Sequence, residues 1–173
     1  MTRVFPLVLM WLCAIALSGC GSEANTSNAN ATLVKVDKSE RRLYLMHNDQ
    51  VLHEFPIALG GNPRGHKQQE GDHRTPEGRY ILDYKKEDSS FYRAIHISYP
   101  NAQDTEAARA AGVSPGGLIM IHGQPNRFGF LAPILQWFDW TEGCIALTNR
   151  EMDIVMDIVM DVVQVGTPIE IEW

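Results

Sequence analysis

The chain has 173 residues, of which 45% are hydrophobic, and its formal charge is −6 with an isoelectric point near 5.4. This length predicts one folded domain with a short appendage, and the hydrophobic content is sufficient for a substantial core. The acidic balance, without a basic stripe, argues against nucleic acid as a partner.

The first 20 residues differ in composition from the rest of the chain. Arg3 is their only charged residue, Val4 to Leu17 is apolar, and Leu17-Ser18-Gly19-Cys20 follows. A positive start, a short hydrophobic middle and small residues at the end are typical of a secretory signal peptide, and the apolar run is short for a membrane span. The ending resembles the bacterial lipobox, which implies that Cys20 is lipidated. An ordinary signal cleaved nearby, or a short anchor, is the alternative.

Residues 1–20 are therefore expected to be a lipoprotein signal peptide that leads to a periplasmic protein anchored to a membrane by lipid. By resemblance to enterobacterial lipoproteins, Gly21 after the cysteine favours the outer membrane in a cell with two membranes. Residues 21–32 are small and polar and are expected to be a flexible tether.

Removal of the signal peptide and lipidation would reduce the number of free cysteines. Cys13 would be removed and Cys20 would carry lipid, so that Cys144 is left as the one free thiol of the mature chain. An exported protein with one thiol has no internal disulfide. Such a cysteine is either buried and inert or reactive, and Gly143 and His122 favour a reactive thiol.

The chain from residue 33 onward is expected to be mainly β with short helices. Runs of apolar and β-branched residues predict strands at Leu33–Asp37, Leu43–Met46, Val51–Leu59, Arg79–Tyr84, Ala94–Tyr99 and Ile169–Trp173. Gly60 to Asp72 is expected to be a long surface loop, and Thr75-Pro76-Glu77-Gly78 a turn.

Two helices are expected among these strands. Ala102–Ala111 has acids early and an arginine late, and Gly112 can end it. Asn149 to Val163 contains the repeat MDIVMDIVMDVV, whose four-residue step places the methionines on one helical face and the aspartates on another. Asn149 is the expected N-cap, and the helix precedes the last strand. We expect the Met, Ile and Val residues to be buried and the aspartates to face solvent.

The residues most able to carry chemistry lie between Gly117 and Asn149. Leu118 to Ile121 is an apolar run that leads into His122-Gly123, and Gly143-Cys144 leads into a second apolar run. Two such strand ends can aim a thiol and an imidazole at one cleft, where the imidazole activates the thiol as a nucleophile. The amides of Gly143 and Cys144 are candidates to stabilise a developing oxyanion.

The segment between these two residues is rich in aromatic side chains. It contains Phe128, Phe130, Trp137, Phe138 and Trp140. We expect these rings either to form a core cluster or a loop held by its aromatics, or to make a wall or lid of the cleft.

His122-Gly123, a spacer, and Thr141-x-Gly143-Cys144-Ile145 together resemble the signature of the bacterial L,D-transpeptidases, which have YkuD-like catalytic domains. The turn at Thr75 and the strand pattern around Leu43 are also similar to that family. The resemblance covers residues 33–172 and implies a YkuD-like β-sandwich as a catalytic domain over residues 33–173.

This resemblance implies an acyl transfer in cell-wall remodelling. Cys144 would attack the peptide bond after the L-centre of diaminopimelate in a peptidoglycan stem peptide, release D-alanine and form a thioester. His122 would be the base, oriented by a carbonyl near Gly123, and Gly143 would supply an oxyanion amide. The thioester would pass to an amine of another stem or of a wall-attached lipoprotein. The family uses no metal or organic cofactor.

Two departures from the family pattern concern the acceptor. Glu142 stands where the family has histidine, and Ala146 replaces an arginine for which Arg150 is a candidate substitute. Thr141, Arg150 and Trp140 are the candidate substrate-binding residues. These departures resemble a subgroup of the family that includes an amidase. The resemblance makes water the alternative acceptor, and the alternative activity is then that of an L,D-carboxypeptidase or amidase.

Two further hypotheses do not involve acyl transfer. One is a non-catalytic lipoprotein that binds the cell wall. The second is a metal site formed by Cys144, His122 and either His96 or His66, although structural zinc normally has four protein ligands and the spacing typical of such sites is missing from the sequence.

Overall fold

The computed structural model describes residues 30–160 and 166–173. The predicted signal peptide with Cys20, most of the predicted tether and the end of the last predicted helix lie outside these residues. In chain order the elements are β1 Leu33–Asp37, β2 Arg42–His47, β3 Gln50–Pro56, β4 Gly78–Ser89, β5 Tyr92–Ile97, α1 Ala102–Ala111, β6 Met120–His122, η2 Gly129–Leu131, α2 Ala132–Leu135, β7 Ile145–Ala146, α3 Asn149–Met160 and β8 Thr167–Glu172. The expected fold class, mainly β with a helix before the last strand, is confirmed.

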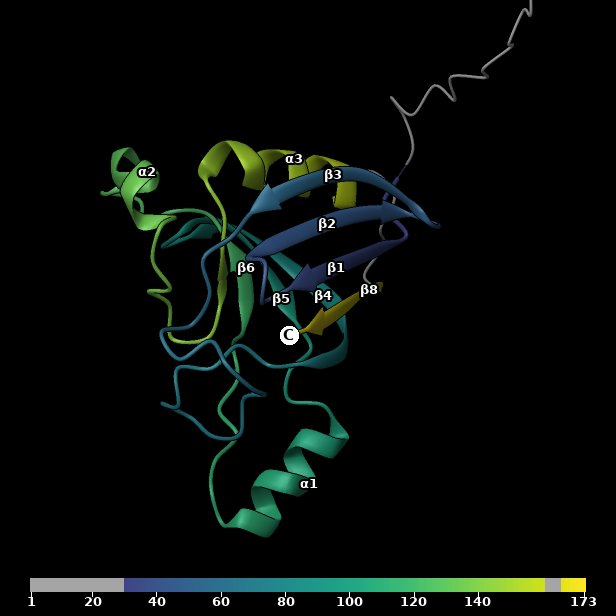
Figure 1. The fold of residues 1–173 in the computed structure, drawn as a ribbon, viewed down its shortest axis with the longest axis vertical. Helices are drawn as coiled ribbons and strands as arrows, with labels where there is room; N and C mark the ends of the chain where they lie inside the picture. Colours follow the sequence, from purple (N-terminus) through teal and green to yellow (C-terminus); the bar gives the residue numbers. More distant parts are fainter. Residues whose placement is uncertain (1–29, 161–165) are drawn as a thin grey trace, which may run out of the picture.

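The strands form one curled sheet of eight strands in the order β3-β2-β1-β8-β4-β5-β6-β7 (Figure 1). The expected sandwich is thus a half-barrel, in which the sheet curls around its own core. β1 pairs antiparallel with β2 and parallel with β8. Alternate residues of these strands are fully buried, as in Val34, Val36, Leu43 and Leu45, because successive side chains of a strand point to opposite faces.

The chain that leaves β3 crosses to the opposite edge of the sheet. The predicted strand Val51–Leu59 ends before its expected limit, at Pro56. Ala58 then exchanges backbone hydrogen bonds with Ala146, and Gly60 bridges to Thr141. These contacts place the segment that follows β3 beside the residues that immediately surround Cys144.

The helices lie on opposite sides of the sheet, with α3 above it and α1 below it in Figure 1. α1 has the predicted bounds, begins with a capping box between Asn101 and Asp104, and ends at Gly112 in the left-handed conformation. In α3, Met152, Val155 and Met156 are buried as expected. None of the helices in the described ranges is long and apolar enough to cross a membrane.

Two expectations for α3 need correction. Thr148, not Asn149, caps the helix, because the Thr148 hydroxyl accepts from the Glu151 amide at 3.3 Å and the Glu151 carboxylate accepts from the Thr148 amide at 2.9 Å. Asp153 is not simply solvated, since its carboxylate pairs with the Arg93 guanidinium at 3.0 Å.

The long loop between β3 and β4 is anchored by a buried lysine. The Lys38 ammonium is fully buried and donates to the carbonyl of Gly65 at 2.9 Å, the carbonyl of Thr75 at 2.9 Å and the Glu77 carboxylate at 2.8 Å. Burial lowers the pKa of Lys38, and the ion pair with Glu77 opposes this. One side chain thus holds both ends of the segment from Gly65 to Glu77.

We predict that Lys38→Met destabilises the fold by about 3–5 kcal/mol, because it leaves two carbonyls and a carboxylate without their buried partner. Urea unfolding followed by circular dichroism measures this change. Lys35→Met is the matched control, since Lys35 forms an exposed pair with Glu172 and its loss is expected to cost less than about 1 kcal/mol. Equal effects of the two substitutions would contradict the role of Lys38 as an anchor.

Candidate active site

The parallel pairing of β6 with β7 brings the two predicted reactive residues onto one face of the sheet. Ile121 is opposite Ile145, and His122 is opposite Ala146. One residue before this pair, Met120 lies level with Cys144, and its amide is 3.4 Å from the Cys144 sulfur. Side chains two residues apart on a strand point the same way, so that His122 and Cys144 project toward the same cleft.

The His122 imidazole is buried and held in one orientation. Its Nδ1 lies 2.7 Å from the Gly123 carbonyl oxygen, which can only accept, so the proton is on Nδ1 and Nε2 of the neutral ring is left as an acceptor. The ring packs against Phe91 at 4.6 Å and against the edge of Trp140 at 5.8 Å between centroids. Burial lowers the pKa of His122, although the bond to Gly123 acts in the opposite direction.

Asn149, the first residue of α3, packs against Gly123 and binds the backbone of Gln124. A side-chain carbon at position 123 would lie 2.8 Å from the Asn149 side-chain oxygen and 2.9 Å from Tyr92, so this position leaves room only for glycine. The same Asn149 oxygen accepts from the Gln124 amide at 2.8 Å. Asn149, expected as a helix cap, instead supports the backbone that orients His122.

The Cys144 thiol is partly buried at the end of the cleft. Its sulfur lies 3.7 Å from the Leu118 carbonyl oxygen, an acceptor for the S–H. Burial raises the pKa of the Cys144 thiol, while the Met120 amide and the Lys67 ammonium counteract this. With the pKa of the thiol raised and that of the imidazole lowered, the resting site favours a neutral thiol and a neutral base.

Thr141 organises the turn that presents Cys144. Its hydroxyl donates to the Cys144 carbonyl at 2.7 Å and accepts from the Gly143 amide at 3.1 Å. The Gly143 amide is thus engaged with Thr141 in this structure, and its predicted oxyanion role stays a prediction. Among the residues that the structure describes, no backbone acceptor contacts the Cys144 amide, which is therefore a candidate oxyanion donor beside the thiol.

Gly143 is required for a different reason. Its φ is +130°, a conformation that glycine adopts readily. A side-chain carbon there would lie 2.6 Å from the Arg74 carbonyl oxygen. The loop that Lys38 anchors thus packs directly behind the turn that carries Cys144.

The cleft has a volume of about 440 Å³ and a mainly apolar lining. The lining residues are Ser89, Phe91, Leu118, Met120, His122, Trp140, Thr141, Glu142 and Cys144. Thr141 and Trp140, two of the predicted substrate-binding residues, thus lie at the cleft. Sequence reasoning missed Phe91 and Met120; the strand alternation around His122 could have indicated Met120, whereas nothing in the sequence indicated Phe91.

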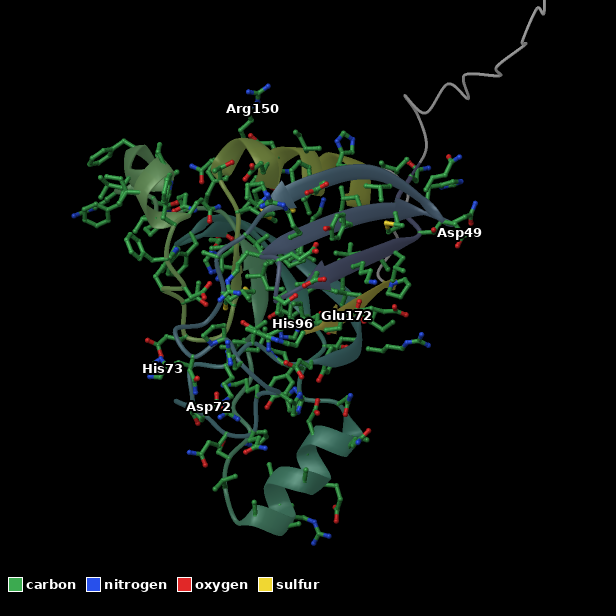
Figure 2. The ribbon with its side chains drawn as sticks, viewed as in Figure 1. Asp49, Asp72, His73, His96, Arg150 and Glu172 are labelled. Atoms are coloured by element: carbon green, nitrogen blue, oxygen red, sulfur yellow. The ribbon has the colours of Figure 1, made fainter. Side chains whose placement is uncertain are left out.

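Glu142, one of the two departures from the family pattern, and Arg150, the candidate substitute for the arginine replaced by Ala146, lie apart. Glu142 lines the cleft, and its carboxylate is 2.7 Å from Nδ1 of His73. Arg150 is exposed on α3 and points away from the body of the molecule in Figure 2. It is not among the residues that line the cleft, so the structure does not bring this predicted substrate-binding residue to the site.

Most of the aromatic residues between His122 and Cys144 form neither a core cluster nor the wall of the cleft. Phe128, Phe130, Trp137 and Phe138 are exposed, and only Trp140 lines the cleft. The histidines considered for a metal site are also engaged elsewhere, His66 with Asp104 at 3.1 Å and His96 with Asp83 at 2.7 Å. Over residues 30–160 and 166–173 no three acidic, cysteine or histidine side chains are grouped to hold a metal.

Comparison with known proteins identifies the family of this chain. Residues 31–171 match the family model described as the L,D-transpeptidase catalytic domain (YkuD). The putative L,D-transpeptidase YafK of Escherichia coli (strain K12) is 32% identical over 141 residues, which are 78% of this chain and 50% of that protein. The chain thus spans about half the length of the curated relatives that it matches.

Solved structures share the fold. The helical cell shape determining protein Pgp2 from Campylobacter jejuni superposes with a TM-score of 0.62 and 27% identity, over 84% of this chain and 48% of that one. Bd1075 from Bdellovibrio bacteriovorus has a TM-score of 0.53 and 22% identity, over 86% of this chain and 50% of that one. With the family model matched over nearly all of the described domain, the chain belongs to the L,D-transpeptidase catalytic domain family.

Proposed function

We propose that this protein is a cysteine acyltransferase that acts on peptidoglycan stem peptides through a thioester on Cys144. The observation that carries the proposal is that the Cys144 thiol and the His122 imidazole line one apolar cleft. The bond from His122 Nδ1 to the Gly123 carbonyl leaves Nε2 as the proton acceptor. Membership of the family supports a stem peptide as the substrate.

The acylation step follows from this arrangement. The sulfur attacks the carbonyl carbon after the L-centre of diaminopimelate while its proton passes to Nε2 of His122. The Cys144 amide stabilises the oxyanion that develops. The C–N bond then breaks, the imidazolium returns its proton to the departing amine of D-alanine, and a thioester remains on Cys144.

The acceptor step uses the same groups in reverse. An amine of a second stem, or of a wall-attached lipoprotein, attacks the thioester and gives a proton to His122. The C–S bond breaks, and His122 returns the proton to the sulfur. The apolar lining of Phe91, Met120 and Trp140 limits competing water around the thioester, which supports transfer.

A second candidate, hydrolysis of the same thioester, is favoured by the pair at the rim of the cleft. Glu142 is two residues from Cys144, and its carboxylate is held by His73 at 2.7 Å. A carboxylate positioned beside a thioester can accept a proton from water. Water as the acceptor makes the enzyme an L,D-carboxypeptidase or amidase.

The proposed location is the periplasm, with the domain attached by lipid on Cys20, to the outer membrane in a cell with two membranes. The signal-peptide pattern of residues 1–20 supports this. The similarity to Pgp2, a protein that determines helical cell shape, supports a part in cell-wall remodelling and cell shape.

Exposure of the protein to a disaccharide-tetrapeptide is expected to produce an acyl adduct on Cys144, detected by intact-mass spectrometry. His122→Asn should slow adduct formation by about 10²–10⁴-fold, since that is the contribution of a general base. His53→Asn, which changes a histidine on β3 away from the cleft, is the control and should leave the rate unchanged. No adduct on Cys144, or an equal rate in both variants, would contradict the proposal.

The pH dependence of acylation tests the protonation states. Because burial lowers the pKa of His122, the base remains neutral as pH falls through the ordinary histidine value of about 6.5. We therefore expect the acidic limb of the acylation rate to lie below about pH 6.5, as measured by quenched-flow mass spectrometry between mildly acidic and mildly alkaline pH. A limb above that value would show that the site does not lower the pKa of its base.

Glu142→Gln distinguishes the two acceptors. If Glu142 accepts the proton from water, the variant should acylate Cys144 at an unchanged rate but hydrolyse the thioester about 10²-fold more slowly. Product analysis after incubation with tetrapeptide separates tripeptide, from hydrolysis, from cross-linked dimers. Glu54→Gln on β3 is the control; unchanged hydrolysis in Glu142→Gln would remove Glu142 from the reaction.

A further inference from the structure

The segment from Gln124 to Phe138, here called the aromatic protrusion, presents apolar side chains to solvent. Trp137 is 84% exposed, Phe130 76%, Phe138 65%, Ile134 60% and Phe128 51%. Exposed apolar groups on this scale are unusual for a surface without a partner, and grouped ones mark an interaction site.

The protrusion is held in this shape by its own backbone and by the body of the protein. The amides of Phe128 and Leu131 donate to carbonyls three residues before them, both at 2.8 Å. On its inner side Ala132 is buried, and the Gln136 side-chain amide donates to the Ala146 carbonyl at 3.3 Å. The inner side is thus fixed against β7 while the aromatic rings remain outside.

The charge of the protrusion differs from that of the whole chain. Gln124 to Phe138 contains no acidic residue, and Arg127 is its only charged side chain, in a protein with a formal charge of −6. A surface that combines tryptophan, phenylalanine and isoleucine with an arginine matches the boundary between lipid headgroups and acyl chains.

The position of the protrusion fits a bilayer as its occupant. In Figure 1, α2 and the point where the described chain starts both lie toward the end of the molecule that carries α3, and α1 lies at the other end. Arg150 projects from this same end in Figure 2. A chain from Cys20 to residue 32 spans at most about 45 Å, which keeps the domain close to the membrane that would hold its lipid.

We propose that the aromatic protrusion inserts into the interface of a phospholipid bilayer and is a second point of attachment beside the N-terminal lipid. The proposal goes beyond the acyl transfer and rests on the predicted lipid at Cys20 only for the proximity of the membrane. A single acyl anchor does not fix the orientation of a domain. A second contact through Phe130 and Trp137 fixes which end of the domain faces the lipid.

Vesicle sedimentation tests this with the predicted processed chain, from residue 20 onward, carrying Cys20→Ser so that no acyl chain contributes. Vesicles of phosphatidylethanolamine and phosphatidylglycerol are expected to bind this protein. Phe130→Ser and Trp137→Ser should each weaken binding by about tenfold, since burying one aromatic side chain shifts a partition equilibrium by roughly that factor or more. Trp173→Ser is the matched control, because Trp173 is a half-exposed tryptophan outside the protrusion.

Three results would overturn the proposal. The first is no binding of the unmutated chain to vesicles, and the second is equal binding by all variants. The third is self-association, or binding to isolated peptidoglycan, that depends on Phe130 and Trp137 while binding to vesicles does not depend on them. Each variant is also tested for the Cys144 adduct with tetrapeptide. An intact adduct without vesicle binding rejects only the membrane contact, whereas vesicle binding without an adduct rejects only the acyl transfer.

Discussion

The parallel pairing of β6 with β7 determines where the thiol and the imidazole lie. The two strands are short, and their register places Met120 beside Cys144. His122 is two residues further along β6 and therefore points to the same face. Neither residue could be moved by one position without turning its side chain to the other face of the sheet. The remaining contacts at the site stabilise this register and restrict the two side chains within it.

Those supporting contacts come from segments that are distant in the sequence. Asn149 supports the backbone at Gly123 and Gln124, Thr141 fixes the turn before Cys144, and the loop held by Lys38 packs behind Gly143. The two reactive groups themselves are favoured in neutral form, because burial raises the pKa of the Cys144 thiol and lowers that of His122. For the proposed acylation, a proton transfer that accompanies attack by the sulfur fits this resting state better than a preformed ion pair.

Local patterns in the sequence predicted the features that depend on neighbouring residues. The strands, the bounds of α1 and the location of His122 and Cys144 at strand ends follow from alternation, capping residues and glycines, which act within a few residues. Features that depend on tertiary contacts were missed or wrong. Asn149 has the side chain of a helix cap, but its oxygen accepts from the Gln124 amide. Arg150 points outward because of its position on the first turn of α3. The exposure of Trp137 and Phe130 could not be read from composition, since aromatic residues are usually buried.

The crossing from β3 to the β7 edge connects the two ends of the sheet near the turn that carries Cys144. The bonds between Ala58 and Ala146 join residues from opposite halves of the chain, and closing a loop of this length has an entropic cost. The backbone contacts around the Cys144 turn are therefore complete only when the segment after β3 has crossed to this edge. A substitution that frees the end of β3 would therefore also loosen the turn that carries Cys144, although the two lie toward opposite edges of the sheet.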